Sequence, residues 1–326
     1  MNIIFWGTPD YSVESLKILI DSHHEISAVI TQPDKKRSRG SKLIASPIKK
    51  IALNHNIPVF TPNKIKNNIS LIENLKSLKS DVFVVIAYGK ILSSEILNIP
   101  RYGCWNAHAS LLPRWRGAAP IHWSLLKGDS FTGVGIIKMD EGLDTGDLLL
   151  EEKVGIKESD NLHTLSQKLS ILSSNLIYKS LEIIEKEPKA IKSKLYPQKL
   201  KNIEVKYARM INKEDYKLDF NDRAENILRK VKGLFPKSYI IHGGKVLKIL
   251  NIRLLSESEK KKTDKTYAKR NINNIGKVLE IFKNEGVVIA TKTEPILIKE
   301  IKLEGKNISK GNQLIQQLNL NKGEKI

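Results

Sequence analysis

The chain has 326 residues, of which 40% are hydrophobic and 28% charged, a composition typical of a globular protein with about two domains. Its single cysteine, Cys104, excludes an internal disulfide, and no apolar run reaches the roughly 18 residues of a membrane span. A formal net charge of +20 favours a polyanionic partner such as nucleic acid, although the drift of an AT-rich genome towards lysine would also explain the excess.

The first part of the chain alternates short apolar runs with helical patterns. Strands are predicted at residues 2–6, 26–30, 81–86, 104–107 and 132–139. No basic-then-apolar signal precedes the first strand, so we expect a cytoplasmic protein. Strands that alternate with helices predict a doubly wound, mostly parallel α/β sheet, which binds ligands beyond the carboxyl ends of its strands. The loops expected there are 7–10, 31–46, 87–92, 106–118 and 140–147.

The pattern changes after a long helix predicted at residues 163–185. Residues 187–206 are rich in lysine and proline and are predicted to be a linker. One further helix near residues 223–232 is followed by short strands with turn signals at His242-Gly-Gly244 and Asn284-Glu-Gly286. We therefore expect a small β-barrel domain over residues 207–326, with the polar stretch Ser256–Asn274 as a mobile loop.

Three polar residues form the candidate site. Asn106 and His108 lie two apart at the end of a predicted strand, so their side chains should point to one face, where they could hold and protonate an oxyanion. Asp144 lies between the glycines of Gly142-Leu-Asp-Thr-Gly146, and a carboxylate beside the imidazole would favour its charged form. Each pattern alone is also that of a polar strand end or an ordinary turn, but together they predict an acid–base site.

The residues disfavour other kinds of site. Ser110 lies near His108 but lacks the surroundings of a nucleophile elbow. The seven histidines are scattered and only His23 and His24 are adjacent, so we expect no metal. Gly7-Thr-Pro9 matches neither a dinucleotide fingerprint nor a phosphate-binding loop, which disfavours nicotinamide and ATP.

Several stretches are more distinctive than these isolated patterns. They are Phe5-Trp-Gly-Thr-Pro-Asp10, Thr31-Gln-Pro-Asp34, Arg39-Gly40, Ala87-Tyr-Gly89, Ser110-Leu-Leu-Pro-Arg-Trp-Arg-Gly-Ala-Ala-Pro-Ile121 and Gly142-Leu-Asp-Thr-Gly-Asp147. With them the chain resembles the methionyl-tRNA formyltransferase family over essentially its full length. The Asn-x-His and Asp set is shared by the wider formyltetrahydrofolate-using superfamily, whereas the run from Ser110 to Ile121 is much more specific.

The resemblance implies a Rossmann-like catalytic domain over residues 1–186 and an OB-like, tRNA-binding domain over residues 207–326. It implies transfer of formyl from 10-formyltetrahydrofolate to the amine of methionine on initiator tRNA, by a monomer that uses no metal and no membrane. Asn106, His108 and Asp144 would be catalytic. The residues implied for the folate site are Ser110, Leu111, Leu112, Pro113, Tyr88, Gly89, Lys90, Met139, Asp140 and Gly142.

The resemblance also implies that the loop 32–46 meets the tRNA acceptor stem. The implied contacts are Lys35, Lys36, Arg37, Arg39 and Lys42, with Arg39 the main one. Where many relatives have proline and glycine, this loop reads Asp34-Lys-Lys-Arg-Ser-Arg39, which keeps its charge. With contacts of this kind, the affinity for tRNA would come mainly from its phosphate groups and would fall as the salt concentration rises.

Three other functions stay open on the residues alone. A sugar-nucleotide or purine-pathway formyltransferase would use the same Asn-His-Asp set, but gives no reason for the basic loop and second domain. A formyltetrahydrofolate hydrolase would pass the group to water, which product analysis would detect. A non-catalytic RNA-binding protein on the same scaffold would need none of the three polar residues.

Overall fold

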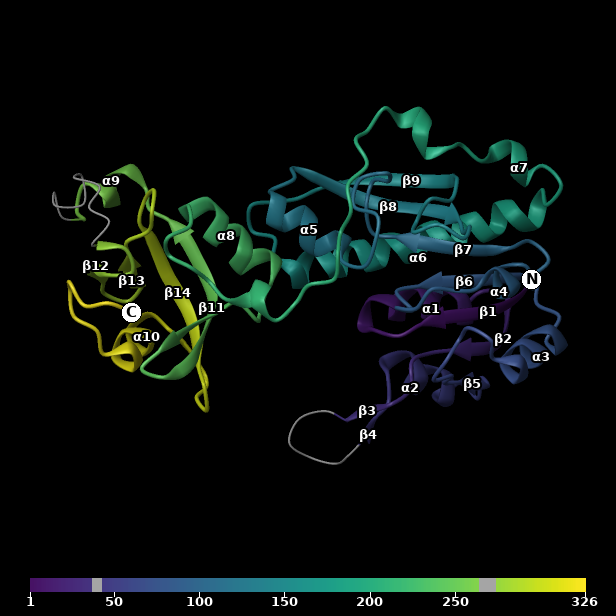
Figure 1. The fold of residues 1–326 in the computed structure, drawn as a ribbon, viewed down its shortest axis with the longest axis horizontal. Helices are drawn as coiled ribbons and strands as arrows, with labels where there is room; N and C mark the ends of the chain where they lie inside the picture. The colour runs from purple at the N-terminus through teal and green to yellow at the C-terminus, as the bar shows by residue number, and fades with distance from the viewer. Residues whose placement is uncertain (37–42, 264–273) are drawn as a thin grey trace. The chain divides into compact units, whose positions relative to one another are not determined.

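The computed structural model describes residues 1–36, 43–263 and 274–326, and the chain divides into two compact units (Figure 1). The first unit comprises Met1–Pro120, Phe131–Ile156 and Thr164–Arg209. The second comprises Ile121–Ser130, Lys157–His163 and Met210–Ile326. Two short segments from the first half of the chain therefore belong with its C-terminal part.

The first unit contains a seven-stranded sheet in the order β5-β2-β1-β6-β7-β8-β9. Its strands are β1 (Asn2–Gly7), β2 (Glu25–Ile30), β5 (Val59–Phe60), β6 (Val82–Ile86), β7 (Cys104–His108), β8 (Phe131–Lys138) and β9 (Leu148–Gly155). Neighbouring strands from β5 to β7 pair in parallel, whereas β8 and β9 pair antiparallel. The prediction of a mostly parallel α/β sheet is confirmed, and so are the strands expected along it.

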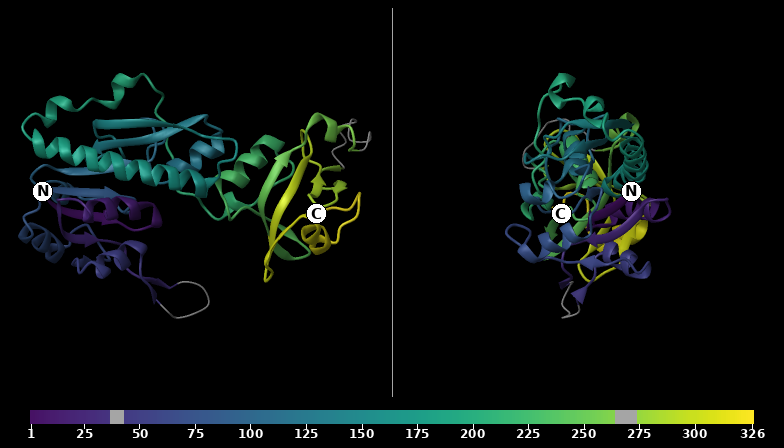
Figure 2. Two further views of the ribbon diagram at one scale, coloured as in Figure 1. Left: turned by 180° about the vertical axis from the view of Figure 1, so that it is seen from behind. Right: turned by 90° about the vertical axis from the view of Figure 1, so that its right-hand side faces the viewer.

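Helices flank this sheet. They are α1 (Val13–Ile20), α2 (Pro47–Asn54), α3 (Ile69–Ser77), α4 (Ser94–Leu97), α6 (Leu162–Lys186) and α7 (Ile191–Lys194), with the 3-10 turns η1 (Asp10–Ser12) and η2 (Gln198–Lys201). α2 begins at a capped end, since the Ser46 hydroxyl accepts from the Lys49 amide and Pro47 occupies the first helical position. The view from behind shows α6 running along the sheet (Figure 2).

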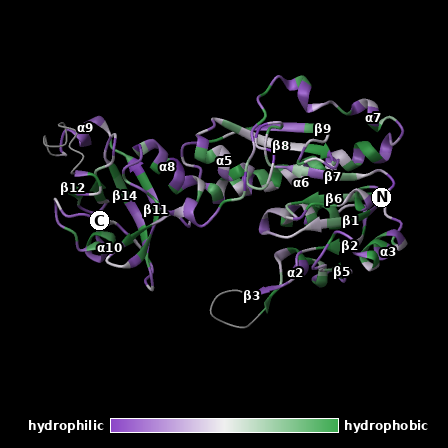
Figure 3. Ribbon diagram, viewed as in Figure 1, coloured by the Kyte–Doolittle hydropathy of each residue, from purple (hydrophilic) through white to green (hydrophobic). Residues whose placement is uncertain are grey.

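The sheet is buried on both faces, as its continuous apolar runs predict. Every residue of β6 is buried, and the central strands appear hydrophobic in Figure 3. On one face, Ile4 and Trp6 pack in a cluster with Leu71 and Leu75 of α3 and with Ile96 of α4. Because this core fixes the strands, the loops at their carboxyl ends are held in place.

Cys104 lies inside this first unit and gives a simple test of its packing. Only 1% of the residue is exposed, and burial raises the pKa of its thiol well above the ordinary range. Since the thiolate is the reactive form, we expect the native chain to resist Ellman's reagent and to react only after denaturation in guanidinium. One equivalent of rapid reaction in the native protein would contradict this packing.

The segment expected to be a linker lies against the first unit. Tyr196 exchanges backbone hydrogen bonds with Leu148 of β9, and Gln198 is only 3% exposed. Residues 187–206 also contain α7 and η2, which are too short to produce a hydrophobic periodicity in the sequence.

The second unit contains an antiparallel sheet and several helices, described here for the residues outside 264–273. Its strands are β10 (Tyr239–His242), β11 (Lys245–Leu254), β12 (Val278–Phe282), β13 (Gly286–Ile289), β14 (Ile296–Leu303) and β15 (Ile308–Lys310), in the order β10-β11-β14-β13-β12 with β15 beside β14. Its helical segments are α5 (Pro120–Lys127), η3 (Glu214–Tyr216), α8 (Ala224–Gly233), α9 (Glu257–Lys260) and α10 (Gly311–Leu318). The predicted small β domain and its two turns are confirmed.

The stretch Ser256–Asn274 is only partly described, and its start differs from the prediction of a loop. Ser256 begins α9 with a capping box, in which its hydroxyl accepts from the Glu259 amide and the Glu259 carboxylate accepts from the Ser256 amide. Four residues are too few to show a periodicity, although the Ser-x-x-Glu pattern was visible. Residues 264–273 lie outside the described residues. Across the described ranges, every helix is too short or too polar to cross a membrane.

Candidate active site

The structure brings Asn106, His108 and Asp144 together in the first unit. Asn106 Nδ2 lies 3.4 Å from Asp144 Oδ1, and His108 Nδ1 lies 3.6 Å from Asp144 Oδ2. Both β7 side chains therefore point to the face of the sheet on which Asp144 lies. Both distances exceed those of well-formed hydrogen bonds, so these contacts can give way to a ligand.

The loop that carries Asp144 differs in position from the one that the sequence predicts. The loop 140–147 was expected at the carboxyl ends of parallel strands, but β8 runs antiparallel, and its end at Lys138 pairs with Trp105 at the start of β7. The loop must therefore extend back over the face of β7 to bring Asp144 beside His108. Asp144 itself adopts a left-handed backbone with a φ of 54°, and a side chain at Gly146 would collide with the Lys138 carbonyl.

His108 is held by its other ring nitrogen. Its Nε2 donates to the Trp115 carbonyl at 2.9 Å, which leaves Nδ1 to face the carboxylate. The side chain is only 6% exposed and that of Asp144 15%. Low exposure strengthens the electrostatic interaction between the ring and the carboxylate, since little water screens it.

A second group of residues, which the sequence did not reveal, positions Asp144. The Gly117 amide donates to Asp144 Oδ2 at 2.8 Å. The Gln198 amide donates to the carbonyls of Asp144 and Gly146, and its oxygen accepts two hydrogen bonds from Arg116. No local pattern could have identified Gln198, because it lies 54 residues from Asp144 in the chain.

The segment after His108 is largely buried. Ser110 donates to the Arg114 carbonyl at 2.6 Å, and Leu112 packs in a cluster with Ile137 and Leu148. Ser110 and Leu112 are fully buried, so a ligand here would meet the backbone and the partly exposed Leu111. Trp115 is only 4% exposed, so its ring is part of the buried packing of this segment.

The other residues implied for the folate site lie in two loops. After β6, the Tyr88 carbonyl accepts from Thr8 and from Gln32, and Gly89 has a φ of 83°. Lys90 donates to the carbonyls of Pro62 and Asn63. After β8, Met139 packs against the core, and Asp140 accepts from the Gly142 amide and the Thr145 hydroxyl.

Only part of the basic loop lies within the described residues. Lys35 and Lys36 form the two-residue strand β3, which pairs antiparallel with β4 (Leu43–Ile44). Lys35 is exposed, and so is Leu43. Arg37, Arg39 and Lys42 lie outside the described residues. At the base of the loop, Asp34 forms an ion pair of 2.8 Å with Lys49 of α2.

Comparisons with known proteins agree with this architecture. The formyl transferase family model matches residues 1–181, and the model of the formyl transferase C-terminal domain matches residues 210–319. Two methionyl-tRNA formyltransferases of Prochlorococcus marinus, from strains MIT 9215 and AS9601, are 59% and 57% identical over 325 residues, or 99% of each chain.

Solved structures show the same fold at lower identity. HypX from Aquifex aeolicus in complex with tetrahydrofolic acid is 15% identical with a TM-score of 0.59, over 97% of this chain and 47% of its own. WlaRD, a sugar 3N-formyl transferase, is 19% identical with a TM-score of 0.57, over 94% of this chain and 99% of its own. Given the full-length identity to the curated relatives, the chain belongs to the methionyl-tRNA formyltransferase family.

Proposed function

We propose that the chain transfers formyl from 10-formyltetrahydrofolate to the α-amino group of methionine on initiator tRNA. The observation that carries the proposal is the convergence of Asn106, His108 and Asp144 in a chain 59% identical to methionyl-tRNA formyltransferases over its whole length. A neutral amide donor, an imidazole and a carboxylate are the groups that such an acyl transfer requires.

In the proposed mechanism, the folate supplies the formyl group and the protein residues handle charge and protons. As the methionyl amine attacks the formyl carbon, negative charge grows on the formyl oxygen. Asn106 Nδ2 and His108 Nδ1, which now face Asp144 across long contacts, would donate to that oxygen. His108 would donate as the imidazolium, because its Nε2 hydrogen is already donated to the Trp115 carbonyl. Asp144 would accept the proton of the attacking nitrogen, directly or through water. That proton would then pass to the folate nitrogen as its bond to the formyl carbon breaks, so that tetrahydrofolate leaves as a neutral amine. The reaction requires no metal in this scheme.

The two loops near β6 and β8 have features that suit a folate. The Tyr88 hydroxyl is buried and finds no hydrogen-bond partner among the described residues, while burial raises the pKa of this phenol, so it remains a donor. Each loop also exposes a large apolar side chain, Ile91 at 80% and Leu143 at 51%. An orphan donor and exposed apolar groups match a flat heterocycle with polar edges.

The proposed acceptor, a charged tRNA, explains why the chain carries an excess of basic residues. A small amine would give no reason for a loop that carries Lys35, Lys36, Arg37, Arg39 and Lys42. Phosphate contacts position a tRNA on a protein without reading its sequence. We propose that residues 207–326 extend this contact, that residues 187–206 join the two parts, and that the enzyme acts as a cytoplasmic monomer on charged tRNA.

Formylation by the purified protein tests the proposal. The reaction contains 10-formyltetrahydrofolate and methionine-charged initiator tRNA, with uncharged tRNA as the control. Formyl should appear on the charged tRNA alone. Release of formate at the same rate with and without tRNA would instead identify a hydrolase, and formylation of an amino sugar but not of tRNA would identify a sugar formyltransferase.

Replacing Arg39 by alanine should impair the use of tRNA much more than the binding of folate. The change removes a contact to phosphate and leaves the Asn106, His108 and Asp144 site intact. We expect a higher KM for charged tRNA, a weaker dependence of that KM on salt, and an unchanged Kd for tetrahydrofolate. Lys179→Ala, at an exposed position of α6, is the matched control. Equal losses for tRNA and folate would contradict the assignment and indicate misfolding.

A further inference from the structure

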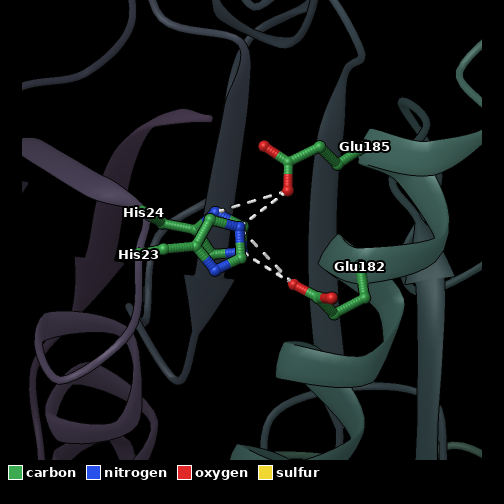
Figure 4. A group of neighbouring side chains, drawn as sticks. All are labelled: His23, His24, Glu182 and Glu185. Atoms are coloured by element: carbon green, nitrogen blue, oxygen red, sulfur yellow. Dashed lines mark hydrogen bonds and ion pairs between the residues drawn. The ribbon is translucent and has the colours of Figure 1, made fainter.

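A cluster of four potential metal ligands lies in the first unit, away from the site described above. His23 and His24 precede β2, and Glu182 and Glu185 lie near the end of α6 (Figure 4). Each offers one ligand atom, and these atoms all lie within 4.8 Å of one another. The cluster is at the amino ends of the parallel strands, whereas Asn106 and His108 lie towards the carboxyl end of β7.

The distances between the ligand atoms are close to those of a tetrahedral site. His23 Nε2 lies 2.8 Å from Glu185 Oε2 and 3.6 Å from Glu182 Oε1, and His24 Nε2 lies 3.8 Å from Glu182 Oε1. Zinc bonds to nitrogen and oxygen of about 2.0–2.1 Å place tetrahedral ligands about 3.3 Å apart. The observed separations lie on both sides of that value, so small side-chain rotations would suffice.

The burial of two ligand atoms is a second observation, independent of the distances. His24 Nε2 and Glu182 Oε1 are both buried, and neither has a hydrogen-bond partner among the described residues. The His24 side chain is fully buried and its residue is 6% exposed. A buried nitrogen and a buried carboxylate oxygen without partners are costly, unless a further atom sits between them.

The amino group of Met1 borders the cluster. The Met1 amino group, 3.3 Å from His24 Nδ1 and 3.0 Å from Glu185 Oε1, is the cation that a metal ion would have to displace.

We propose that His23, His24, Glu182 and Glu185 form a structural binding site for a divalent transition metal ion of the Zn²⁺ class. Two imidazoles and two carboxylates form a donor set that Zn²⁺ takes in proteins. The ion would tie the loop before β2 to the end of α6, two segments separated by more than 150 residues. Since the cluster lies at the amino ends of the parallel strands, whereas Asp144 contacts His108 at the carboxyl end of β7, the ion would add stability and take no part in formyl transfer.

Titration of Zn²⁺ into the full chain, purified without a polyhistidine tag, tests the proposal by calorimetry. We expect one saturable site per chain and a rise in Tm on Zn²⁺ addition. His23→Gln and Glu182→Gln remove one ligand each and should weaken the Kd more than about tenfold and abolish the rise in Tm. Both positions are partly exposed, with side chains 53% and 26% accessible, so these variants should fold.

The controls separate this site from other histidines and from the reaction. His55→Gln removes an exposed histidine at the end of α2 and should leave the Kd for Zn²⁺ unchanged. Formyl transfer by His23→Gln should match that of the unchanged protein. The proposal is overturned if the unchanged chain shows no saturable binding, or if His23→Gln and Glu182→Gln bind Zn²⁺ as tightly as it does.

Discussion

Replacing Asn106 or His108 by alanine is expected to lower the turnover of formyl transfer on the order of a hundredfold or more. Each side chain is proposed to donate to the oxygen that becomes charged in the transition state. Loss of one such donor typically raises the barrier by about 2.7–4 kcal/mol. The measurement is single-turnover formylation of methionine-charged initiator tRNA at saturating folate and tRNA, so that weaker binding does not enter the rate.

The controls for this prediction lie side by side on the surface. Asn54→Ala and His55→Ala make the same two substitutions at exposed positions at the end of α2 and should keep full turnover. All four variants should retain the circular dichroism spectrum and the Kd for tetrahydrofolate of the unchanged enzyme. Near-normal turnover in a folded Asn106→Ala or His108→Ala variant would show that the proton and charge chemistry is carried by other residues.

The second large effect is expected at Gly117, which contacts no reacting atom. Its φ of 116° is rarely adopted by other residues, and a Cβ there would lie 2.9 Å from the Ala208 carbonyl oxygen. Gly117→Ala should therefore cost about 1–3 kcal/mol of stability. It should also displace the amide that donates to Asp144 Oδ2, and misplacing that carboxylate should reduce turnover on the order of a hundredfold.

Gly155→Ala is the matched substitution, because a Cβ at Gly155 meets nothing within 4 Å and no left-handed φ is required. Thermal unfolding and turnover should both stay close to those of the unchanged enzyme. The prediction for Gly117 requires a loss of kcat at a temperature where the variant is fully folded. If Gly117→Ala and Gly155→Ala behaved alike, the backbone at Gly117 would not position Asp144.

The sequence predicted most of the fold because its signals are local. Strands such as β1 and β6 are continuous apolar runs, the start of α2 is a Ser-Pro cap, and the turns at His242-Gly-Gly244 and Asn284-Glu-Gly286 join neighbouring strands. One prediction of secondary structure was wrong in part, at Ser256–Asn274, because the helix α9 at its start is too short to show a helical period.

The candidate site was less completely predictable. The spacing of the polar residues predicted Asn106, His108 and Asp144, the resemblance to a known family then implied the same three, and the structure places them together. The residues that position Asp144 could not be predicted from the sequence. Gln198 and Gly117 donate hydrogen bonds to Asp144, and these bonds join segments that lie far apart in the chain. The loop 140–147 was expected at the carboxyl ends of parallel strands, but the strand before it, β8, runs antiparallel to β7. The residues of a strand do not by themselves indicate whether it pairs parallel or antiparallel with its neighbour.

The sequence by itself therefore determined the formyltransferase family and the α/β sheet with a small β domain, and it pointed to the three polar residues of the candidate site. Only the tertiary structure decided how these parts are arranged. In it, β8 runs antiparallel to β7, and the loop with Asp144 lies over β7. It also brings His23 and His24 beside Glu182 and Glu185. The physical reason is that periodicity and turn signals depend on residues near one another in the chain. Hydrogen bonds and ligand clusters depend on contacts between distant segments, which exist only after the core has packed.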